Sequence, residues 1–337
     1  MTSKPDWGET TSALEVANTY AKQLQGRNVL ITGVSPEGVG EGTAIAIASQ
    51  KPANLILVSR TKERLEAVAS SIRKSYPDVN VQTVTMDLAS QASIREAATK
   101  VNGLISKLDI LINNAGATFN SRSWTAEGIE IQFGANHIGP FLFTKLLLPL
   151  LEKAATQSPA GATRIVNLAS HGHRISPIRF HDYNIENKEV PPEEKPFSPL
   201  PPALTRVKED GYMPIIAYGQ SKTANILFTL YLQEKLKTKG IAAYAVHPGG
   251  VNTNLGRDHD PETADAIAQS SKFWKNCDQG ASTTLVAALD PALNVCNGLY
   301  LSDCQYCPCA DHAKDLTIAK RLWQLSEELI GDKFDLE

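Results

Sequence analysis

The sequence predicts a single α/β domain with a doubly wound parallel sheet of about seven strands and helices on both faces. Three observations predict this fold. Short apolar runs alternate with longer helix-forming segments along the chain. The runs lack polar–apolar alternation, as is typical of strands buried on both faces of a parallel sheet. The 337 residues, 42% of them hydrophobic, suffice for one large domain or two small ones, and no linker divides the chain.

Strands and helices are expected to alternate. The apolar runs predict strands at 28–32, 54–58, 81–85, 109–113, 163–168, 241–246 and 298–301. Helical patterns lie at 40–50, 62–76, 90–106, 126–151, 214–239, 279–289 and 313–330. Repeated units of this kind join parallel strands by right-handed crossovers. One polar, proline-rich segment, 174–213, interrupts the pattern.

Charge and chain ends constrain the class of function. The formal net charge is −3 and the basic residues are dispersed, which argues against binding to nucleic acid or a membrane surface. The N-terminus lacks the apolar core of a signal peptide, and the last three residues match no address or lipidation signal. The most apolar stretch, 141–151, is too short to span a bilayer and contains Lys145 and Pro149. These features predict a cytoplasmic protein without a membrane span.

Tyr218 and Lys222 are four residues apart in the helix expected at 214–239. This spacing places both side chains on one helix face, one turn apart. A phenol has an ordinary pKa of about 10, and a nearby ammonium lowers that pKa toward the range useful for acid–base chemistry. The spacing is common on helix surfaces, so its meaning depends on the neighbouring motifs.

A glycine-rich turn, Thr32–Gly42, joins the first strand to the first helix. Glycines there let the backbone approach a pyrophosphate at the helix N-terminus, and a turn without a ligand is the alternative. Arg60 follows the second strand, and no acidic residue precedes Glu63. An acidic residue at this position binds the ribose of NAD, whereas an arginine suits the 2′-phosphate of NADP. The sequence favours NADP, with a solvated charge at the helix start as the alternative.

Seven short motifs follow one another along the chain. They are the glycine loop 32–40, Asp87-Leu88, and the segments 113–116, 136–141, 165–170, 218–225 and 247–253. Together they resemble the motifs of the short-chain dehydrogenase/reductase family, in its retinol-dehydrogenase-like branch, which includes the WW-domain oxidoreductases and many fungal members. The resemblance covers about residues 11–330 and implies a Rossmann-type fold.

The resemblance implies four catalytic residues, Ser170, Tyr218, Lys222 and Asn136. Tyr218 would exchange a proton with a carbonyl oxygen, and Ser170 would hydrogen-bond that oxygen. Lys222 would lower the pKa of Tyr218 and bind the nicotinamide ribose, and Asn136 would hold a water that links Lys222 to solvent. An ordinary strand-end serine and an ordinary helix asparagine are the alternatives for Ser170 and Asn136.

The resemblance also implies cofactor contacts. Asp87 would bind the adenine amino group, or it only starts the following turn. Residues 113–116 would lie along the adenosine ribose, and Val251 and Thr253 would hold the nicotinamide carboxamide. The full expected set is Gly33, Ser35, Gly38, Val39, Gly40, Arg60, Asp87, Leu88, Asn113, Ala115, Gly116, Tyr218, Lys222, Val251 and Thr253.

Two departures from the family pattern affect the site. Four residues, Val34–Glu37, stand where the family usually has three, and Glu37 would repel a pyrophosphate unless it points outward. The 174–213 insertion begins beside Ser170 and ends just before Tyr218. This placement favours a mobile substrate lid over a passive surface loop. The segment 254–278 is expected to form a second substrate-side lobe.

The sequence therefore predicts an NADPH-dependent carbonyl reductase, or an NADP-linked alcohol dehydrogenase, that acts on a small lipophilic aldehyde, ketone or alcohol. A catalytically silent NADP-binding regulator or scaffold is the alternative, and the intact Ser170, Tyr218 and Lys222 argue against it. The sequence leaves the identity of the substrate and the oligomeric state open, a homo-oligomer included.

The five cysteines all lie in the last quarter of the chain and do not form the pattern of a secreted disulfide framework. Cys304, Cys307 and Cys309, with His312 nearby, suggest zinc ligands and a metal-dependent enzyme as a third hypothesis. Their spacing fits no structural zinc motif, so reduced cysteines and no metal are expected.

Overall fold

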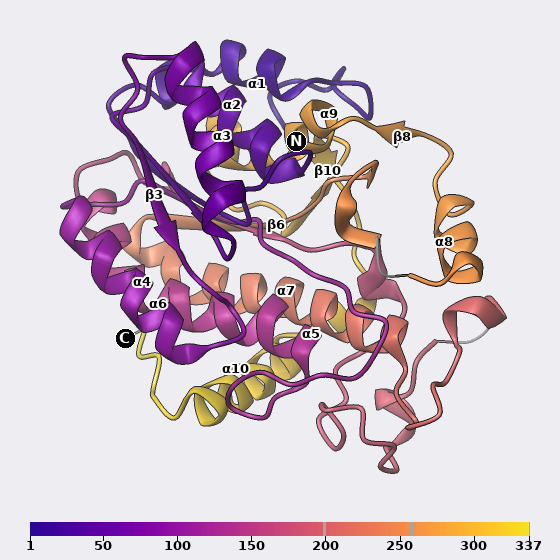
Figure 1. Cartoon of the computed structure of the whole chain (residues 1–337). Helices are drawn as coiled ribbons and strands as arrows, with labels where there is room; N and C mark the ends of the chain where they lie inside the picture. Colours follow the sequence, from indigo (N-terminus) through magenta and orange to yellow (C-terminus); the bar gives the residue numbers. More distant parts are fainter. Residues whose placement is uncertain (198–199, 257–258, 337) are drawn as a thin grey trace.

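An eight-stranded sheet forms the centre of the computed structural model, which describes residues 1–197, 200–256 and 259–336 (Figure 1). The strand order is β10-β9-β6-β5-β4-β1-β2-β3. The strands are β1 (Asn28–Thr32), β2 (Asn54–Ser59), β3 (Val81–Thr85), β4 (Ile110–Asn113), β5 (Thr163–Leu168), β6 (Ile241–His247), β9 (Tyr300–Ser302) and β10 (Gln305–Tyr306). All neighbours pair in parallel except β10 with β9. The predicted doubly wound Rossmann-type sheet is confirmed, with one short antiparallel strand added.

Helices cover both faces of this sheet (Figure 1). One face carries α1 (Ala13–Thr19), α2 (Val39–Ala48), α3 (Lys62–Ser75) and α9 (Cys277–Leu289). The other carries α4 (Gln91–Leu104), α6 (Gly139–Ala155), α7 (Pro214–Leu236) and α10 (Leu316–Ile330). Successive strand residues point to opposite faces, so Leu30 packs toward the second set and Val29 and Ile31 toward the first. This two-sided burial explains the continuous apolar runs.

The helix expected at 126–151 begins later than predicted. The Thr125 hydroxyl accepts hydrogen bonds from the Glu127 and Ile129 N–H groups, and Gly128 has a φ of 76°, which together make a tight turn. Glu130 then caps the short α5 (Ile131–Phe133). A π-helical turn, Gly134–Ile138, leads into α6. Such turns are frequent at functional sites, and this one contains Asn136.

Several short elements have no counterpart among the predicted ones. They are α1, α8 (Pro261–Ala268), β10, and the two-stranded sheet of β7 (Gly250–Val251) and β8 (Trp274–Lys275). Elements of two to eight residues are too short to show a clear hydrophobic period.

The first half of the 174–213 insertion packs against the domain. Ile178 is buried in the core beside α7, and a buried ion pair joins Arg179 to Asp182 at 3.0 Å. The buried carboxylate of Glu194 accepts a hydrogen bond from the His181 N–H at 3.0 Å. This part of the insertion is thus stabilised by packing against the core of the domain. Residues 198–199 of the expected lid, and 257–258 of the second substrate-side segment, lie outside the described residues.

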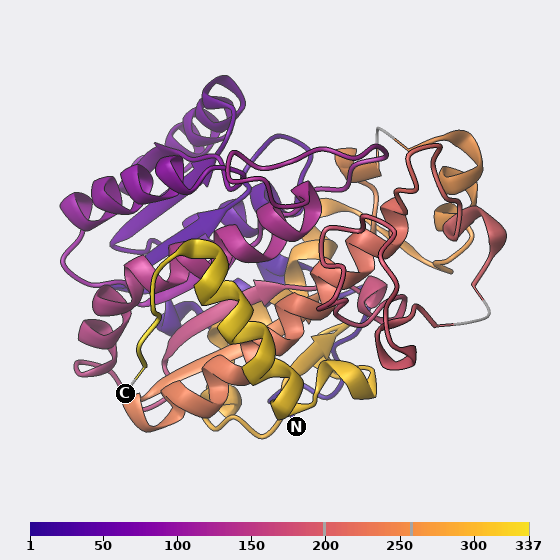
Figure 2. The same cartoon turned by 90° about the horizontal axis from the view of Figure 1, so that it is seen from below.

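The second half of the insertion is joined to the 254–278 segment by ion pairs. Arg206 pairs with Asp260 at 3.6 Å and also with Glu262, and Lys208 pairs with Asp260 at 3.8 Å. Figures 1 and 2 both place the insertion and α8 at the same end of the molecule. The two segments that were expected to flank the substrate are therefore in contact.

Helix α10 lies along α7 on the outside of the domain (Figure 2). Its Trp323 ring packs on Phe141 of α6 and Tyr231 of α7, with ring centres 4.8 and 4.6 Å apart. Among the helices of the described residues, none has the length and apolar character needed to cross a membrane.

Candidate functional site

A groove of about 330 Å³ lies at the carboxyl ends of the central strands. β1 and β4 are neighbours in the sheet although β2 and β3 follow β1 in the chain, so the crossovers diverge at this point and leave a crevice. Most residues expected to bind the cofactor line the groove: Gly33, Ser35, Gly38, Val39, Gly40, Arg60, Asp87, Leu88, Ala115, Gly116, Tyr218, Lys222 and Thr253. Asn136 lines it as well. Tertiary structure thus brings residues from both halves of the chain to one crevice.

The glycine loop fits a phosphate group. Gly33 has a φ of 73°, and a Cβ there would lie 2.5 Å from the Cα of Ala115, so glycine lets the loop rest on the 113–116 segment. The N-terminus of α2 begins after Gly38 with no side-chain cap. Its first N–H groups therefore remain available to an anion in the groove.

Glu37, which belongs to the longer loop, lies at the rim of the groove in a left-handed conformation with a φ of 62°. Its N–H donates to Glu41 at 2.8 Å, and its carboxylate accepts a hydrogen bond from the Asn254 amide at 3.2 Å. This hydrogen bond joins the longer loop to Asn254, which also lines the groove.

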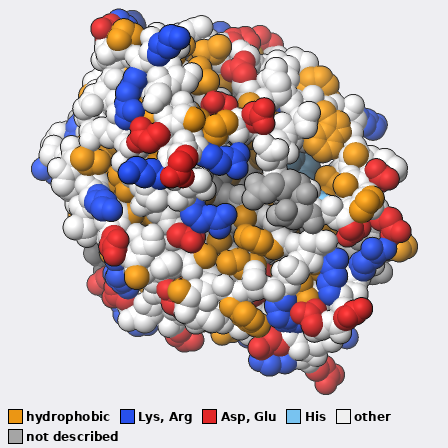
Figure 3. All heavy atoms as spheres, viewed as in Figure 1, with side chains coloured by type: hydrophobic (Ala, Val, Ile, Leu, Met, Phe, Trp, Pro, Cys, Tyr) orange, Lys and Arg blue, Asp and Glu red, His pale blue; other side chains and the backbone are white. Residues whose placement is uncertain are grey.

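Arg60 and Arg64 line one end of the groove, near Asp87. Neither guanidinium has an ion pair with any carboxylate of the described residues. Asp87 accepts a hydrogen bond from the Ala89 N–H at 2.9 Å, so it does start the next turn while it also lines the groove. Basic and acidic side chains are otherwise intermixed over the face shown in Figure 3.

Tyr218 and Lys222 lie at the other end, on the face of α7 that meets the strand ends. The Lys222 ammonium donates to the Leu168 carbonyl at 3.0 Å and lies 5.6 Å from the centre of the Tyr218 ring. Burial lowers the pKa of Lys222 to about 8. Burial also raises the pKa of Tyr218, and a hydrogen bond with Ser170 offsets part of that rise. The expected fall in the Tyr218 pKa is therefore not found, and burial instead moves the two pKa values apart, with that of Lys222 below that of Tyr218.

Ser170 stands at the end of β5, where its hydroxyl accepts a hydrogen bond from the Gly172 N–H at 3.1 Å. Asn136 uses its side chain to hold the segment that leaves β4: its amide accepts from the Ala117 N–H at 2.8 Å and donates to the Ala117 carbonyl at 2.9 Å. It also donates to the hydroxyl of Ser221 on α7 at 3.0 Å. Asn136 thus positions the wall of the groove beside Lys222, and its predicted role in holding a water stays a prediction.

Two residues of the expected cofactor set do not line the groove. The Asn113 side chain points into the core and donates to Asn167 at 2.8 Å. Val251 packs toward α9, where a Cβ on Gly280 would lie 2.8 Å from its side chain. Asn114 lines the groove instead and donates to the Thr32 carbonyl at 2.8 Å. Successive residues of an extended chain point to opposite sides, so only one of Asn113 and Asn114 can face the groove. The sequence alone did not show which of the two does so.

Other groove residues were missed as well. Arg64 lies in the first turn of α3, four residues after Arg60, which precedes that helix, and a second arginine so near in the sequence was the available signal. Phe119, Ile131 and Leu255 make one part of the lining apolar. They come from loops and an irregular helix start, for which periodicity gives no signal.

The cysteine cluster has no metal-binding arrangement. Cys304 is buried, and Cys307 and Cys309 are partly exposed. The His312 ring contacts the His173 carbonyl at 2.9 Å. Within the described part of the chain, no group of three or more His, Cys, Asp or Glu side chains could hold a metal ion.

Comparisons with known proteins agree with this arrangement. Residues 27–184 match the family described as short chain dehydrogenase. Retinol dehydrogenase 12 of Mus musculus is 36% identical over 313 residues, which cover 93% of this chain and 89% of that protein. Oxidoreductase fscI of Fusarium equiseti is 35% identical over 243 residues, which cover 72% of this chain and 93% of that protein.

Solved structures show the same architecture. An uncharacterized protein from Mycobacterium paratuberculosis gives a TM-score of 0.66 at 29% identity, with 94% of this chain and 98% of that one covered. The RhlG/NADP complex of Pseudomonas aeruginosa gives 0.60 at 23% identity, with 84% and 96% covered. The motifs, the groove and the relatives agree, and the chain belongs to the short-chain dehydrogenase family of oxidoreductases, in its retinol-dehydrogenase-like branch.

Proposed function

We propose that this protein is an NADPH-dependent carbonyl reductase, or the corresponding NADP-linked alcohol dehydrogenase, for lipophilic substrates. Membership of the family makes it an oxidoreductase of alcohols or carbonyls with a nicotinamide cofactor. The observation that carries the finer proposal is the groove itself, which has Arg60 and Arg64 at one end and Tyr218 and Lys222 at the other.

The residues present fit a dinucleotide phosphate. The uncapped N-terminus of α2 suits the pyrophosphate, and two guanidinium groups without a described carboxylate partner suit a 2′-phosphate. Arginine is well matched to this group because its planar fork of N–H donors fits phosphate oxygens. At the other end, the buried ammonium of Lys222 would bind ribose hydroxyls.

In the proposed reaction, the cofactor, a bound dihydronicotinamide, would supply the hydride and side chains of the protein would handle the proton. The Tyr218 hydroxyl would donate its proton to the substrate oxygen, and the Ser170 hydroxyl would hydrogen-bond that oxygen as charge develops on it. A Cβ on Gly172 would lie 2.9 Å from the Tyr218 ring and 3.5 Å from the Ser170 hydroxyl oxygen, so the two side chains lie beside the same residue and could meet one substrate oxygen. In the oxidative direction, the deprotonated Tyr218 would accept the proton from the alcohol, and Ser170 would keep its hydrogen bond to the same oxygen.

A lipophilic substrate is supported by the apolar part of the groove lining. Phe119, Ile131 and Leu255 contribute apolar side chains there. Several relatives are named as retinol dehydrogenases, and the name denotes a lipophilic alcohol. A cytoplasmic location and a homo-oligomeric state stay predictions.

Replacing Arg60 tests the cofactor assignment. Arg60→Ala should weaken NADPH binding by roughly 1.5–3 kcal/mol, the cost of losing hydrogen bonds to a charged group, and should leave NADH binding nearly unchanged. Calorimetric titration with both cofactors measures the difference. Lys62→Ala is the matched control, because it removes a neighbouring positive charge that does not line the groove. Equal losses of binding free energy for NADPH and NADH would contradict the assignment of Arg60 to the 2′-phosphate.

A catalytically silent NADP-binding regulator is the competing function. It requires the groove but not a proton donor, so the placement of Tyr218 together with Lys222 in the groove argues against it. The decisive measurement is NADPH consumption with a panel of lipophilic aldehydes and ketones. Tight NADPH binding without turnover on any of them would favour the regulator.

The lid also stays a proposal, now confined to the part of the insertion that meets the 254–278 segment. Arg206→Ala should loosen this contact and change the KM for substrate by about two- to fivefold, as expected for partly exposed ion pairs. The NADPH dissociation constant should stay within about twofold, because the contact lies on the substrate side.

Lys188→Ala is the matched control for Arg206→Ala, since it removes an exposed ion pair with Glu186 elsewhere in the insertion. Hydrogen exchange with and without substrate would measure closure directly. If substrate leaves hydrogen exchange in this segment unchanged and Arg206→Ala leaves the KM unchanged, the segment is a passive surface loop.

A further inference from the structure

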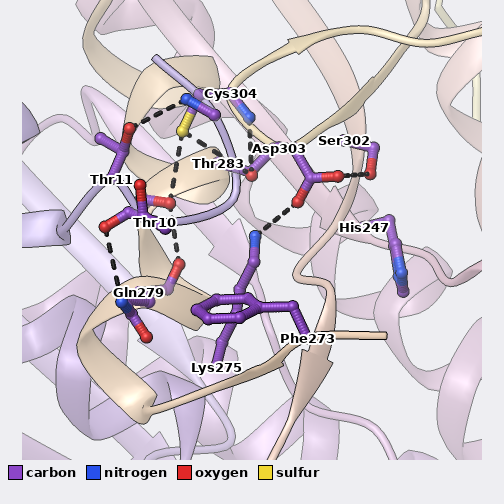
Figure 4. A network of polar contacts seen from close by, with 12 residues as sticks. Thr10, Thr11, His247, Phe273, Lys275, Gln279, Thr283, Ser302, Asp303 and Cys304 are labelled. Carbon is purple, nitrogen blue, oxygen red and sulfur yellow. Dashed lines mark hydrogen bonds and ion pairs between the residues drawn. The ribbon is translucent and has the colours of Figure 1, made fainter. Parts of the chain in front are cut away.

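Lys275 is a buried lysine that the proposed reaction does not use. It ends β8 and its side chain is 2% exposed. Its ammonium pairs with the carboxylate of Asp303 at 2.6 Å, and Figure 4 shows the two side chains pointing toward each other. A buried ammonium is costly unless it is paired, so this ion pair fixes where the Lys275 side chain lies.

Lys275 holds the chain that leaves β6. Val251 of β7 pairs with Lys275, and the Asn252 N–H donates to the Lys275 carbonyl at 3.1 Å. Gly249 has a φ of 97°, and a Cβ there would lie 2.7 Å from Cε of Lys275. The backbone and the side chain of Lys275 therefore both support this turn, from Gly249 to Asn252.

The supported turn is part of the groove. Pro248 and Thr253, at its two ends, both line the groove on the side of Tyr218 and Lys222. Val251 packs between α2 and α9, because a Cβ on Gly280 would lie 2.8 Å from Val251 and 3.3 Å from Val39. The turn is thus held from one side by α9 and from the other by Lys275.

Asp303 is itself held in place. It lies in the turn between β9 and β10, where Asp303 and Cys304 have φ values of 48° and 62°. The Cys304 N–H donates to the Thr283 hydroxyl of α9 at 3.1 Å (Figure 4). The residue before this turn, Ser302, pairs with His247 at the end of β6. The partner of Lys275 is therefore anchored to the sheet and to α9.

We propose that the Lys275–Asp303 ion pair positions the 248–253 turn against the nicotinamide half of the cofactor, which makes Lys275 and Asp303 positioning residues for the reaction. This inference rests on the proposed function. The pair acts through the turn, and neither residue is among the groove-lining side chains. Its loss should therefore weaken the nicotinamide half of the site and spare the half around Arg60.

Two ligands allow binding to the two halves of the site to be measured separately. NADPH fills both, whereas 2′-phospho-ADP-ribose is the same molecule without the nicotinamide. Lys275→Met retains an apolar stem and should raise the NADPH dissociation constant about tenfold, while that of 2′-phospho-ADP-ribose stays within about twofold. Lys275→Arg, which can keep the ion pair, should recover part of the NADPH affinity. Lys272→Met is the control, because Lys272 is a nearby lysine with no ion pair to a described residue.

Asp303→Asn should change the dissociation constants of the two ligands in the same way as Lys275→Met. If the unpaired, buried Lys275 ammonium prevents this variant from folding, Lys275→Met alone tests the inference. Equal weakening of both ligands in Lys275→Met would show a general structural role and overturn the inference, as would unchanged binding of NADPH. If the wild-type protein binds neither ligand, the proposed function fails, and the inference fails with it. If the wild type binds both and the variants do not discriminate, only the inference fails.

Discussion

Tyr218→Phe is expected to lower turnover by at least ~10²-fold, the usual contribution of a positioned general acid. The substitution removes only the hydroxyl that would give its proton to the substrate oxygen. Burial raises the pKa of Tyr218, so the phenol is protonated at neutral pH and ready to act as an acid in carbonyl reduction. NADPH affinity should stay within about twofold, because the ring remains. Stopped-time assays of NADPH consumption at saturating cofactor measure the loss.

Tyr231→Phe makes the same change on the same helix, α7, at a ring that packs on Trp323 outside the groove. It should retain wild-type turnover. If Tyr218→Phe kept more than half of the wild-type activity, the proposed proton donor would be wrong. Retained NADPH binding in this variant shows that the fold and the groove survive.

Lys222→Met is expected to impair catalysis and cofactor binding together. Its ammonium lies 5.6 Å from the Tyr218 ring centre and donates to the Leu168 carbonyl at 3.0 Å, so it is placed to serve both the phenol and the ribose. Turnover should fall by about 10²-fold, and NADPH binding should weaken by roughly 1.5–3 kcal/mol as charge-assisted hydrogen bonds are lost. Lys235→Met is the control, since it removes an ammonium of the same helix that lies over Tyr231. A loss of turnover with unchanged NADPH affinity would contradict the double role.

The same variant tests the protonation of Lys222 through stability. Burial lowers its pKa from the ordinary 10.5 to about 8, so between these two values the unfolded chain holds a proton that the folded protein has released. Unfolding stability rises with pH wherever the unfolded state binds more protons. The free energy of unfolding of the wild type should therefore rise with pH across this interval relative to Lys222→Met, measured by urea unfolding without cofactor. A difference independent of pH would mean that Lys222 titrates at its ordinary pKa.

Local patterns in the sequence determined the sheet, the family and most of the groove. β1 and β4 were recognisable because burial on both faces favours consecutive apolar residues, as at 29–31 and 110–112. Tyr218 and Lys222 were recognisable because a helix brings residues four apart onto one face. The glycine loop was recognisable because a tight turn between strand and helix requires small residues at defined places. In each case the relevant neighbours are close in sequence.

Only the tertiary structure decided features that depend on distant residues. The sequence did not show that Asn114 rather than Asn113 faces the groove, since that depends on how β4 sits against β5. The Tyr218 pKa was expected to fall, but burial by the surrounding chain raises it.

The insertion and the turn after β6 depend on the same kind of distant contact. The whole 174–213 insertion was expected to be a mobile lid, yet its first half packs on the core of the domain, with Ile178 beside α7. Lys275 meets Asp303 only because β8 and the β9–β10 turn converge where β6 ends. Burial and partner choice arise when separate strands and helices come together, and no local pattern of residue types encodes them.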